Sequence, residues 1–359
     1  MLIRTYQLRF VTPAFLGNAE QNGQWRTPPI KALLRQWWRV AYAADKDYRV
    51  DLSEMRAAEA KLFGAAADSA GASSQSRVRL RLDRWTTGRL TQWQELATVK
   101  HPEVRGPDNR ERPVGSDLYL GYGPLKLGRG ARSPSLKGNA AIQVDEKAEF
   151  GVAFADGADS GRLQRALDLM NLYGALGGRS RNGWGSFTLM PLAGTPALAS
   201  SLDELPAREW RKALDRDWPH AIGVGDDGRR LVWQTEALAD WKAVMRRLAE
   251  IKVGLRTQFI FTSGRNASRP EDRHWLSYPV TNHNVSRWSE KGKGDFRLPN
   301  SLRFKVRPDA EGRLHGVIFH VPCLPPLAFS PDRTAIESVW QRVHTYLNDP
   351  AQRLTQISA

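Results

Sequence analysis

The chain has 359 residues, of which 53 are Lys or Arg and 38 are Asp or Glu, so its formal net charge is +15 at pH 7. The length suits two domains, the apolar fraction of 41 % supports a hydrophobic core, and the positive charge indicates a polyanionic partner. Cys323 is the only cysteine, which excludes a disulfide framework and a zinc site built from cysteines. Because no stretch of about 18 apolar residues is present and residues 1–4 lead into a strand pattern rather than a signal peptide, we expect a soluble, cytoplasmic protein with no membrane segment.

The first half of the chain alternates strand patterns with helical ones. Alternation with period two indicates strands, and apolar residues three and four positions apart indicate helices. In chain order the sequence predicts a strand over 3–11, helices over 28–44 and 52–63, strands over 77–82 and 149–155, a helix over 160–176 and a strand from Phe187 onward. Arginine alternates with Val and Leu over 77–82, which gives that strand a basic face.

Two insertions separate the strands over 77–82 and 149–155. Residues 98–116 are rich in charge, Pro and Gly, whereas residues 126–137 hold four basic residues and no acid, so that we expect a basic loop or hairpin there. The remaining order (strand, helix, helix, strand, strand, helix, strand) suits a ferredoxin-like split βαβ unit with long insertions. Common RNA-binding modules are built on such a sheet.

The helix predicted over 28–44 carries a row of basic residues. Lys31, Arg35 and Arg39 recur every four residues and therefore lie along one side of the helix, and no acidic residue of the helix interrupts them before Asp45. Such a row suits the phosphates of a nucleic acid. The alternative is a plain amphipathic helix with a solvated basic face.

The segment over 175–187 holds four glycines, two arginines and a tryptophan, with no acidic residue. It follows a helix pattern and precedes a strand pattern, which is the reverse of a dinucleotide-binding fingerprint. Glycine lets a backbone turn tightly and approach a ligand closely, and an arginine can donate two hydrogen bonds to one phosphate. The alternative is a glycine-rich turn with solvated arginines, and for the tryptophan it is core packing instead of base stacking. From this segment we predict RNA contacts by Gly177, Gly178, Arg179, Arg181, Gly183 and Trp184.

The second half is less regular. Residues 191–207 are rich in Pro, Ala, Ser and Thr and read as a linker between domains at 1–190 and 208–359. Beyond it the sequence predicts strands over 231–233, 302–306 and 316–322, shorter ones over 259–261 and 277–280, and helices over 235–251 and 336–347. This content permits a second, degenerate ferredoxin-like domain. The expected fold class is therefore α+β, with two ferredoxin-like (RRM-like) domains that carry long insertions.

Several of these motifs resemble those of the RAMP superfamily of CRISPR proteins. The segments 12–17 (TPAFLG) and 26–39 (RTPPIKALLRQWWR) look like its N-terminal signature. The stretches 62–64, 119–123 and 176–187 resemble later family motifs in the same order, and 298–304 resembles a C-terminal one more weakly. Ala32 departs from the pattern, since the family usually has glycine there, and residues 27–30 depart from the commoner Arg-x-x-Ser-Ile-Lys form. Within the superfamily, the sequence is most similar to subunit one of the type III-B Cmr complex.

This resemblance implies two ferredoxin-like folds and a place in an RNA-guided effector complex. The subunit would lie near the 3′ end of the crRNA, beside other Cmr or RAMP subunits, and would help to capture target RNA for antiviral defence. The implied partners are crRNA, target RNA and those subunits, and the implied role does not include RNA cleavage. Base pairing between guide and target, not this protein, would read the sequence.

The sequence offers no recognisable catalytic motif. A RAMP enzyme that cleaves RNA would need an acid–base group, most often His, and none of the seven histidines lies in the predicted basic helix or the glycine-rich segment. His283, in a polar and basic stretch, is the histidine of most interest, and Asp226 and Asp227 suit a turn better than a metal site. We therefore expect no enzyme activity, no cofactor and no metal. The alternatives are a RAMP endoribonuclease that processes crRNA, and a generic RNA-binding module outside CRISPR.

Overall fold

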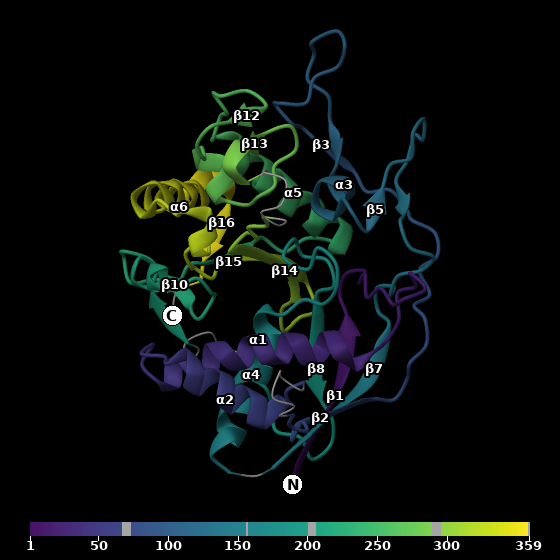
Figure 1. Ribbon diagram of the computed structural model, residues 1–359. Helices are drawn as coiled ribbons and strands as arrows, with labels where there is room; N and C mark the ends of the chain where they lie inside the picture. The colour runs from purple at the N-terminus through teal and green to yellow at the C-terminus, as the bar shows by residue number, and fades with distance from the viewer. Residues whose placement is uncertain (67–72, 156, 200–205, 289–295, 358–359) are drawn as a thin grey trace. The chain divides into compact units, whose positions relative to one another are not determined.

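The computed structural model describes residues 1–66, 73–155, 157–199, 206–288 and 296–357, and divides into two compact units (Figure 1). The first unit comprises Met1–Glu95, Leu120–Pro206 and Lys305–Leu314, and the second comprises Leu96–Tyr119, Ala207–Phe304 and His315–Ala359. Each unit therefore includes a segment from the other half of the sequence, which the sequence pattern did not indicate. The domain boundaries at 190 and 207 stay a prediction, and residues 200–205 of the expected linker lie outside the described residues.

The first unit is built on a four-stranded antiparallel sheet in the order β2-β7-β1-β8. Its strands are β1 (Leu2–Phe10), β2 (Arg79–Leu82), β7 (Lys147–Phe154) and β8 (Phe187–Pro191), and its helices are α1 (Thr27–Asp45), α2 (Leu52–Phe63) and α4 (Ala158–Tyr173). Tyr6 of β1 lies opposite Phe150 of β7, and Leu8 lies opposite Leu189 of β8. The predicted strands and helices of this half are thus confirmed, with small shifts at their ends.

One face of this sheet is buried and the other is open. Tyr6 and Leu8 of β1 and Val152 of β7 are fully buried, as the period-two alternation requires. α1 and α4 pack against each other, and the rings of Trp37 and Tyr173 lie 5.8 Å apart. On the other face Ile3 remains 60 % exposed. Edge strand β2 places its arginines on this open face.

Short elements fill the insertion between β2 and β7. They are β3 (Thr98–Val99), β4 (Val114–Gly115), α3 (Ser116–Gly121), β5 (Leu125–Lys126) and β6 (Ser135–Leu136). β3 pairs with β4, and β5 pairs with β6, each antiparallel. Of the two forms expected for the basic stretch 126–137, the structure has the hairpin.

A second four-stranded sheet has the order β14-β15-β11-β16. Its strands are β11 (Val232–Thr235), β14 (Leu302–Pro308), β15 (Leu314–His320) and β16 (Leu354–Gln356), and its helices are α5 (Trp241–Thr257) and α6 (Arg333–Asn348). When the four strands of each sheet are numbered by their order along the chain, both sheets have the same spatial order: second, third, first, fourth. The buried side chains beside this sheet include Trp233, Leu248, Val317, Val339 and Trp340.

Two expectations for the second half are corrected. α5 begins at Trp241 rather than near 235, because the Asp240 side chain accepts the N–H of Ala243 at 2.8 Å and caps the helix there. The strands expected over 259–261 and 277–280 are wrong, since residues 259–261 are irregular and 277–280 make only isolated bridges. The remaining short elements are β9 (Ala207–Glu209), β10 (Ile222–Val224), β12 (Asn266–Ala267), β13 (Asn284–Val285) and 3-10 turns at Lys212–Asp215, Asp272–Trp275, Ser286–Trp288, Leu327–Phe329 and Pro350–Gln352.

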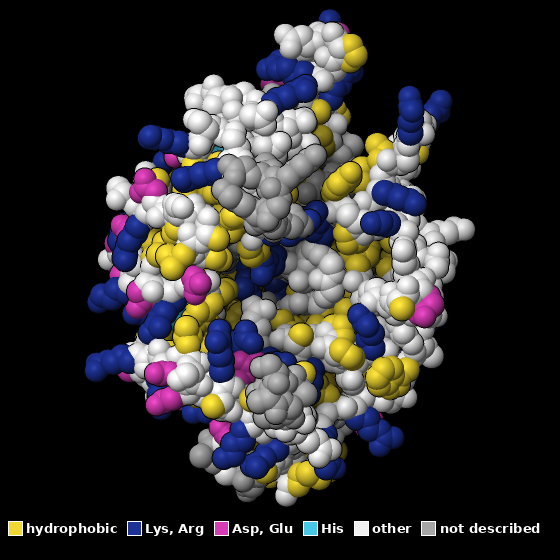
Figure 2. Space-filling view, viewed as in Figure 1, with side chains coloured by type: hydrophobic (Ala, Val, Ile, Leu, Met, Phe, Trp, Pro, Cys, Tyr) yellow, Lys and Arg dark blue, Asp and Glu magenta, His cyan; other side chains and the backbone are white. Residues whose placement is uncertain are grey.

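The described residues thus form a mixed α/β protein with six α-helices and several small, mainly antiparallel sheets. Among these residues, no helix has both the length and the apolar character needed to cross a membrane. In the face viewed in Figure 2, Lys and Arg side chains are visibly more abundant than Asp and Glu side chains, in keeping with the net charge of +15.

Candidate nucleic-acid interface

The glycine-rich segment forms a closed loop between α4 and β8. The N–H of Leu176 donates to Gly185 O at 2.9 Å, and Ala175 pairs with Ser186 in an antiparallel bridge. The N–H of Gly185 donates to Pro13 O at 2.9 Å, which ties the loop to the chain after β1. These backbone hydrogen bonds fix the conformation of the loop from within.

The glycines of the loop allow close approach to the protein's own backbone. Gly185 has a φ of +66°, and a Cβ atom there would lie 1.8 Å from Leu176 O. Gly177 has a φ of +93°, and its Cβ would lie 2.7 Å from Phe15 O, which also accepts the N–H of Gly178 at 3.0 Å. Glycine is therefore needed here for the fold itself. Contact of Gly177 and Gly178 with RNA stays a prediction.

Side chains from the strand ends hold the exit of the loop. Gly183 O accepts hydrogen bonds from Thr12 Oγ1 and Ser186 Oγ, both at 2.8 Å. Ser186 Oγ in turn accepts the N–H of Val306 at 2.9 Å. The predicted RNA contact of Gly183 is untested, and in this structure its carbonyl serves the fold.

Lys305 holds the entry of the loop. Its fully buried ammonium donates to Asn171 O at 2.5 Å and to Gly174 O at 2.7 Å, and lies 4.8 Å from the centre of the Phe187 ring. Burial, together with the charge of Arg307, lowers the pKa of Lys305 well below its usual value. No local pattern in the sequence indicates this role of Lys305, because it lies about 130 residues from the carbonyls that it binds.

The two loop arginines lie on the outer part of the loop. Arg179 is exposed, and its Nε donates to Tyr122 O at 2.6 Å, while Arg181 is half-buried. Asn182 Nδ2 donates to Leu120 O at 2.7 Å. The loop is therefore attached to the aromatic stretch 119–123, and an arginine guanidinium remains at its surface.

Trp184 is fully buried. Its ring centroid lies 5.5 Å from those of Phe15 and Trp93, and Gly121 packs closely against its indole. Of the two roles weighed for this residue, the structure supports core packing. The prediction that Trp184 stacks on a base is corrected, since its ring has no exposed face.

A pocket of about 350 Å³ opens beside the loop. Phe15, which accepts the N–H of Gly178, and Pro124, which packs against Gly178, both line it. Among the described residues that line it, Lys137 of the basic hairpin is the charged one. The full lining consists of Phe15, Gly17, Asn18, Gln21, Gly23, Gly123, Pro124, Leu136, Lys137, Gly138 and Ala140. The sequence indicated the hairpin but not the contribution of residues 17–23.

The basic row on α1 faces α2 and is partly neutralised there. Arg35 Nη2 and Arg39 Nε each lie 2.6 Å from a carboxylate oxygen of Glu59. The Glu59 side chain is only 5 % exposed, whereas those of Arg35 and Arg39 are 38 % and 43 % exposed. The acid that the α1 pattern lacks thus comes from α2. Phosphate contact by Lys31, Arg35 and Arg39 stays a prediction.

The electrostatics of this cluster favour its charged form. Burial alone would raise the pKa of the Glu59 carboxyl, but hydrogen bonds from Arg39 and Arg35 outweigh burial and hold that pKa below its usual value. The hydrogen bond between Arg39 and Glu59 also raises the pKa of Arg39. Desolvation, followed by the charge of Arg35, lowers the pKa of Lys31.

The histidines of the second unit make structural contacts. His283 stacks on Phe261 with ring centroids 3.9 Å apart, and its Nδ1 lies 2.9 Å from Gly264 O. His320 and His344 are buried and lie 3.0 Å apart between Nδ1 and Nε2, and burial lowers the pKa of His344 to about 3. Within the described part of the chain, no three His, Cys, Asp or Glu side chains are grouped to hold a metal ion. The expectation that the chain has no enzyme activity stays a prediction.

Comparison with solved structures gives weak similarities. One is to Cmr1 from Pyrococcus furiosus in its apo form, with 13 % identity and a TM-score of 0.46 over 95 % of this chain and 96 % of that chain. Another is to a chain of the type III-B Cmr-beta complex bound to cognate target RNA, with 11 % identity and a TM-score of 0.44 over 95 % of this chain and 99 % of that chain. A third, in a type IV-B CRISPR complex, has 12 % identity and a TM-score of 0.28 over 56 % of this chain and 94 % of that chain.

The family comparison is decisive for membership. No curated protein matches the chain. The family model of the RAMP superfamily matches residues 7–188, which include the end of β1, α1, β2, β7, α4 and the glycine-rich loop up to the start of β8. The match covers half of the chain and all the motifs that resemble the family except the weaker one over 298–304. This chain belongs to the RAMP superfamily.

Proposed function

We propose that this chain is a non-catalytic RNA-binding subunit of a type III-B CRISPR effector complex. In this proposal it lies in the cytoplasm near the 3′ end of the crRNA, contacts other Cmr or RAMP subunits, and helps to capture target RNA for antiviral defence. Three observations support it: membership of the RAMP superfamily, the net charge of +15, and the sequence motifs that resemble subunit one of the Cmr complex.

The observation that carries the proposal is the glycine-rich loop, braced at both ends with Arg179 at its surface. A loop that is ordered before binding loses little conformational entropy when RNA binds. The Arg179 guanidinium and the Lys137 ammonium beside the adjoining pocket are suited to phosphate oxygens. Phosphate contacts position RNA without reading its sequence, which leaves recognition to base pairing with the guide.

We also infer that each four-stranded sheet, with its helices, is a ferredoxin-like unit. The element orders β1-α1-β2-β7-α4-β8 and β11-α5-β14-β15-α6-β16 both follow the βαββαβ pattern. The strand order is the same in the two sheets. Superposition of the two units in an experimental structure would test this inference.

The function is tested by binding a guide-length single-stranded RNA to the purified chain, measured by fluorescence anisotropy over a salt series. The test variant is Arg179→Gln/Arg181→Gln. The control is Arg229→Gln/Arg333→Gln, which removes the same charge from exposed arginines that are paired with acids at 2.7 and 2.8 Å. We expect about tenfold weaker binding for the loop variant and little change for the control. The slope of log K against log salt should become shallower by about 0.7 for each phosphate that the variant no longer binds.

Two outcomes would contradict the proposal. Equal binding by the loop variant and the wild type would remove the loop from the RNA site. Cleavage of the RNA at a defined position in the same samples, read on a denaturing gel, would replace the non-catalytic role with that of an endoribonuclease.

A further inference from the structure

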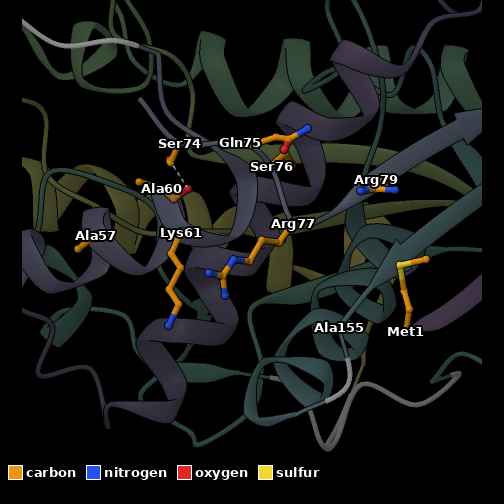
Figure 3. A pocket seen from close by; sticks show the side chains of 10 residues that line it. All are labelled: Met1, Ala57, Ala60, Lys61, Ser74, Gln75, Ser76, Arg77, Arg79 and Ala155. Atoms are coloured by element: carbon orange, nitrogen blue, oxygen red, sulfur yellow. Dashed lines mark hydrogen bonds between the residues drawn. The ribbon is translucent and has the colours of Figure 1, made fainter. Parts of the chain in front are cut away.

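A second basic site lies at the edge of the first sheet. A pocket of about 780 Å³ opens between α2, the segment that leads into edge strand β2, and the ends of β1 and β7. We call it the edge pocket; it is lined by Met1, Ala57, Ala60, Lys61, Ser74, Gln75, Ser76, Arg77, Arg79 and Ala155. Figure 3 shows Lys61 and Arg77 extending in the same part of the pocket, with Arg79 further along the strand. None of these described lining residues is acidic.

The cations of the edge pocket have no counter-charge among the residues that the structure describes. Within the described ranges, Lys61, Arg77 and Arg79 make no ion pair and no side-chain hydrogen bond. Several arginines elsewhere in the same unit are paired: Arg162, for example, lies 2.7 Å from Asp45. Three unpaired cations in one pocket repel one another, so an anion bound among them would be favoured.

Edge strand β2 and the bend before it present three exposed arginines. Arg77, in the bend, and Arg79 and Arg81, in the strand, are exposed, whereas Val78 and Leu82 are buried. Alternate residues of a strand, such as Arg79 and Arg81, lie about 6.7 Å apart on one face. This spacing is of the same order as that of successive phosphates in an extended single strand of nucleic acid. The row therefore matches a linear polyanion better than an isolated anion.

The remaining lining specifies which part of the polyanion is bound. Gln75 supplies an amide group that can donate to phosphate oxygens, whereas the Ser76 hydroxyl already donates to Val78 O at 2.6 Å. Ala57 and Ala60 leave room for a backbone to approach. None of the lining residues that the structure describes is aromatic, so they offer bases no surface on which to stack. The chemistry is that of phosphate recognition without sequence preference.

We propose that the edge pocket binds the phosphate backbone of single-stranded nucleic acid, with Lys61, Arg77 and Arg79 as the phosphate ligands and Arg81 extending the row. This site lies outside the glycine-rich loop and its adjoining pocket, and it adds a second contact to the proposed function. The proposal does not depend on the loop, because a different set of residues carries it. An acidic protein segment on the same cations is the competing occupant.

The test uses the full chain, a fluorescent oligo-uridine RNA and anisotropy over a salt series. The variant is Lys61→Gln/Arg77→Gln/Arg79→Gln. The matched control removes the same charge from exposed, ion-paired arginines: Arg229→Gln/Arg246→Gln/Arg333→Gln. We expect at least tenfold weaker binding by the pocket variant, with a salt slope shallower by about 2, at about 0.7 for each of three phosphates. Oligo-adenosine should give the same result, and thermal unfolding should be unchanged.

Each remaining outcome is decisive. Binding by the pocket variant equal to that of the control overturns the proposal, while loss of binding by Arg179→Gln/Arg181→Gln in the same series leaves the proposed function standing. If instead the pocket variant binds more weakly than the control and Arg179→Gln/Arg181→Gln binds like the wild type, RNA contact by the loop is contradicted and the edge-pocket proposal stands. If polyglutamate binds the wild type and oligo-uridine does not, the occupant is an acidic protein segment and the proposal fails. If neither ligand binds the wild type, both the proposal and the proposed RNA-binding role are overturned.

Discussion

Two basic regions of the first unit differ in what surrounds their cations. On α1, Arg35 and Arg39 share the buried carboxylate of Glu59, whereas in the edge pocket Arg77 and Arg79 make no ion pair to a described residue. A paired cation contributes to the fold and loses part of its field, while an unpaired, exposed cation keeps its charge for a ligand. A row of basic residues is therefore evidence for a binding site only when its partners are known.

The largest effect should come from removing the cations of α1. Arg35→Gln/Arg39→Gln leaves the buried Glu59 carboxylate without a counter-charge, and we expect the free energy of unfolding to fall by about 3 kcal/mol. Arg77→Gln/Arg79→Gln, with the same loss of charge, should change it by less than about 0.5 kcal/mol. Urea unfolding of both variants makes the measurement. Equal destabilisation by the two would abolish the distinction between the regions.

Removing the acid should have a smaller effect. We expect Glu59→Gln to lower the free energy of unfolding by about 2 kcal/mol, below the roughly 3–5 kcal/mol of a fully buried pair. The reason is that the side chains of Arg35 and Arg39 are 38 % and 43 % exposed and regain water. Glu54→Gln, on the same helix but 65 % exposed, is the control, and should stay within about 0.5 kcal/mol. If Glu54→Gln lowered the free energy of unfolding by as much as Glu59→Gln, the ion pairs of Glu59 would not account for its effect.

The contribution of Glu59 should depend on pH. Its pKa is held below the usual value in the folded chain, so its stabilisation is complete above the unfolded pKa of about 4.3 and is lost as pH falls through the folded pKa. The difference in unfolding free energy between wild type and Glu59→Gln should therefore be constant above about pH 5 and shrink at lower pH. Urea midpoints for both proteins from neutral to acid pH provide the measurement. A difference that grows on acidification would contradict the ion pair.

The smallest effect should come from giving the edge pocket its own acid. Ala57→Glu places a carboxylate four residues before Lys61 on α2, a pairing that stabilises a helix by about 0.3–0.5 kcal/mol. The same change should weaken oligo-uridine binding severalfold, because a paired lysine is less available to phosphate. The combination of a slight rise in stability with weaker binding distinguishes the pocket from the α1 row. Tighter binding would show that Lys61 is not a phosphate ligand.

Local patterns predicted the first sheet and its helices well. Strand alternation in β1 and the apolar spacing of α1 depend on residues close in sequence, and the structure reproduces both. The second half was harder to predict for two reasons. The start of α5 depends on one capping side chain, Asp240. The segments over 259–261 and 277–280 contain apolar and aromatic residues but do not form regular strand ladders. Apolar character alone does not distinguish a strand from an irregular segment.

The candidate site was predictable in position but not in detail. The loop residues over 175–187 were found from composition, yet the burial of Trp184 and the support from Lys305 depend on contacts across more than 90 residues. The partner of the α1 row, Glu59, likewise comes from a different helix. A sequence shows which charges exist, and only the fold shows which of them remain unpaired.

The most direct test of RNA contact by the first unit is photo-cross-linking of a 4-thiouridine guide-length RNA to the full chain, followed by identification of the cross-linked peptides. We predict cross-links in peptides that contain residues 175–187, with a second set in peptides that contain residues 74–81. Cross-links confined to residues 207–304, or their complete absence from the first unit, would contradict RNA binding through the glycine-rich loop and the edge pocket.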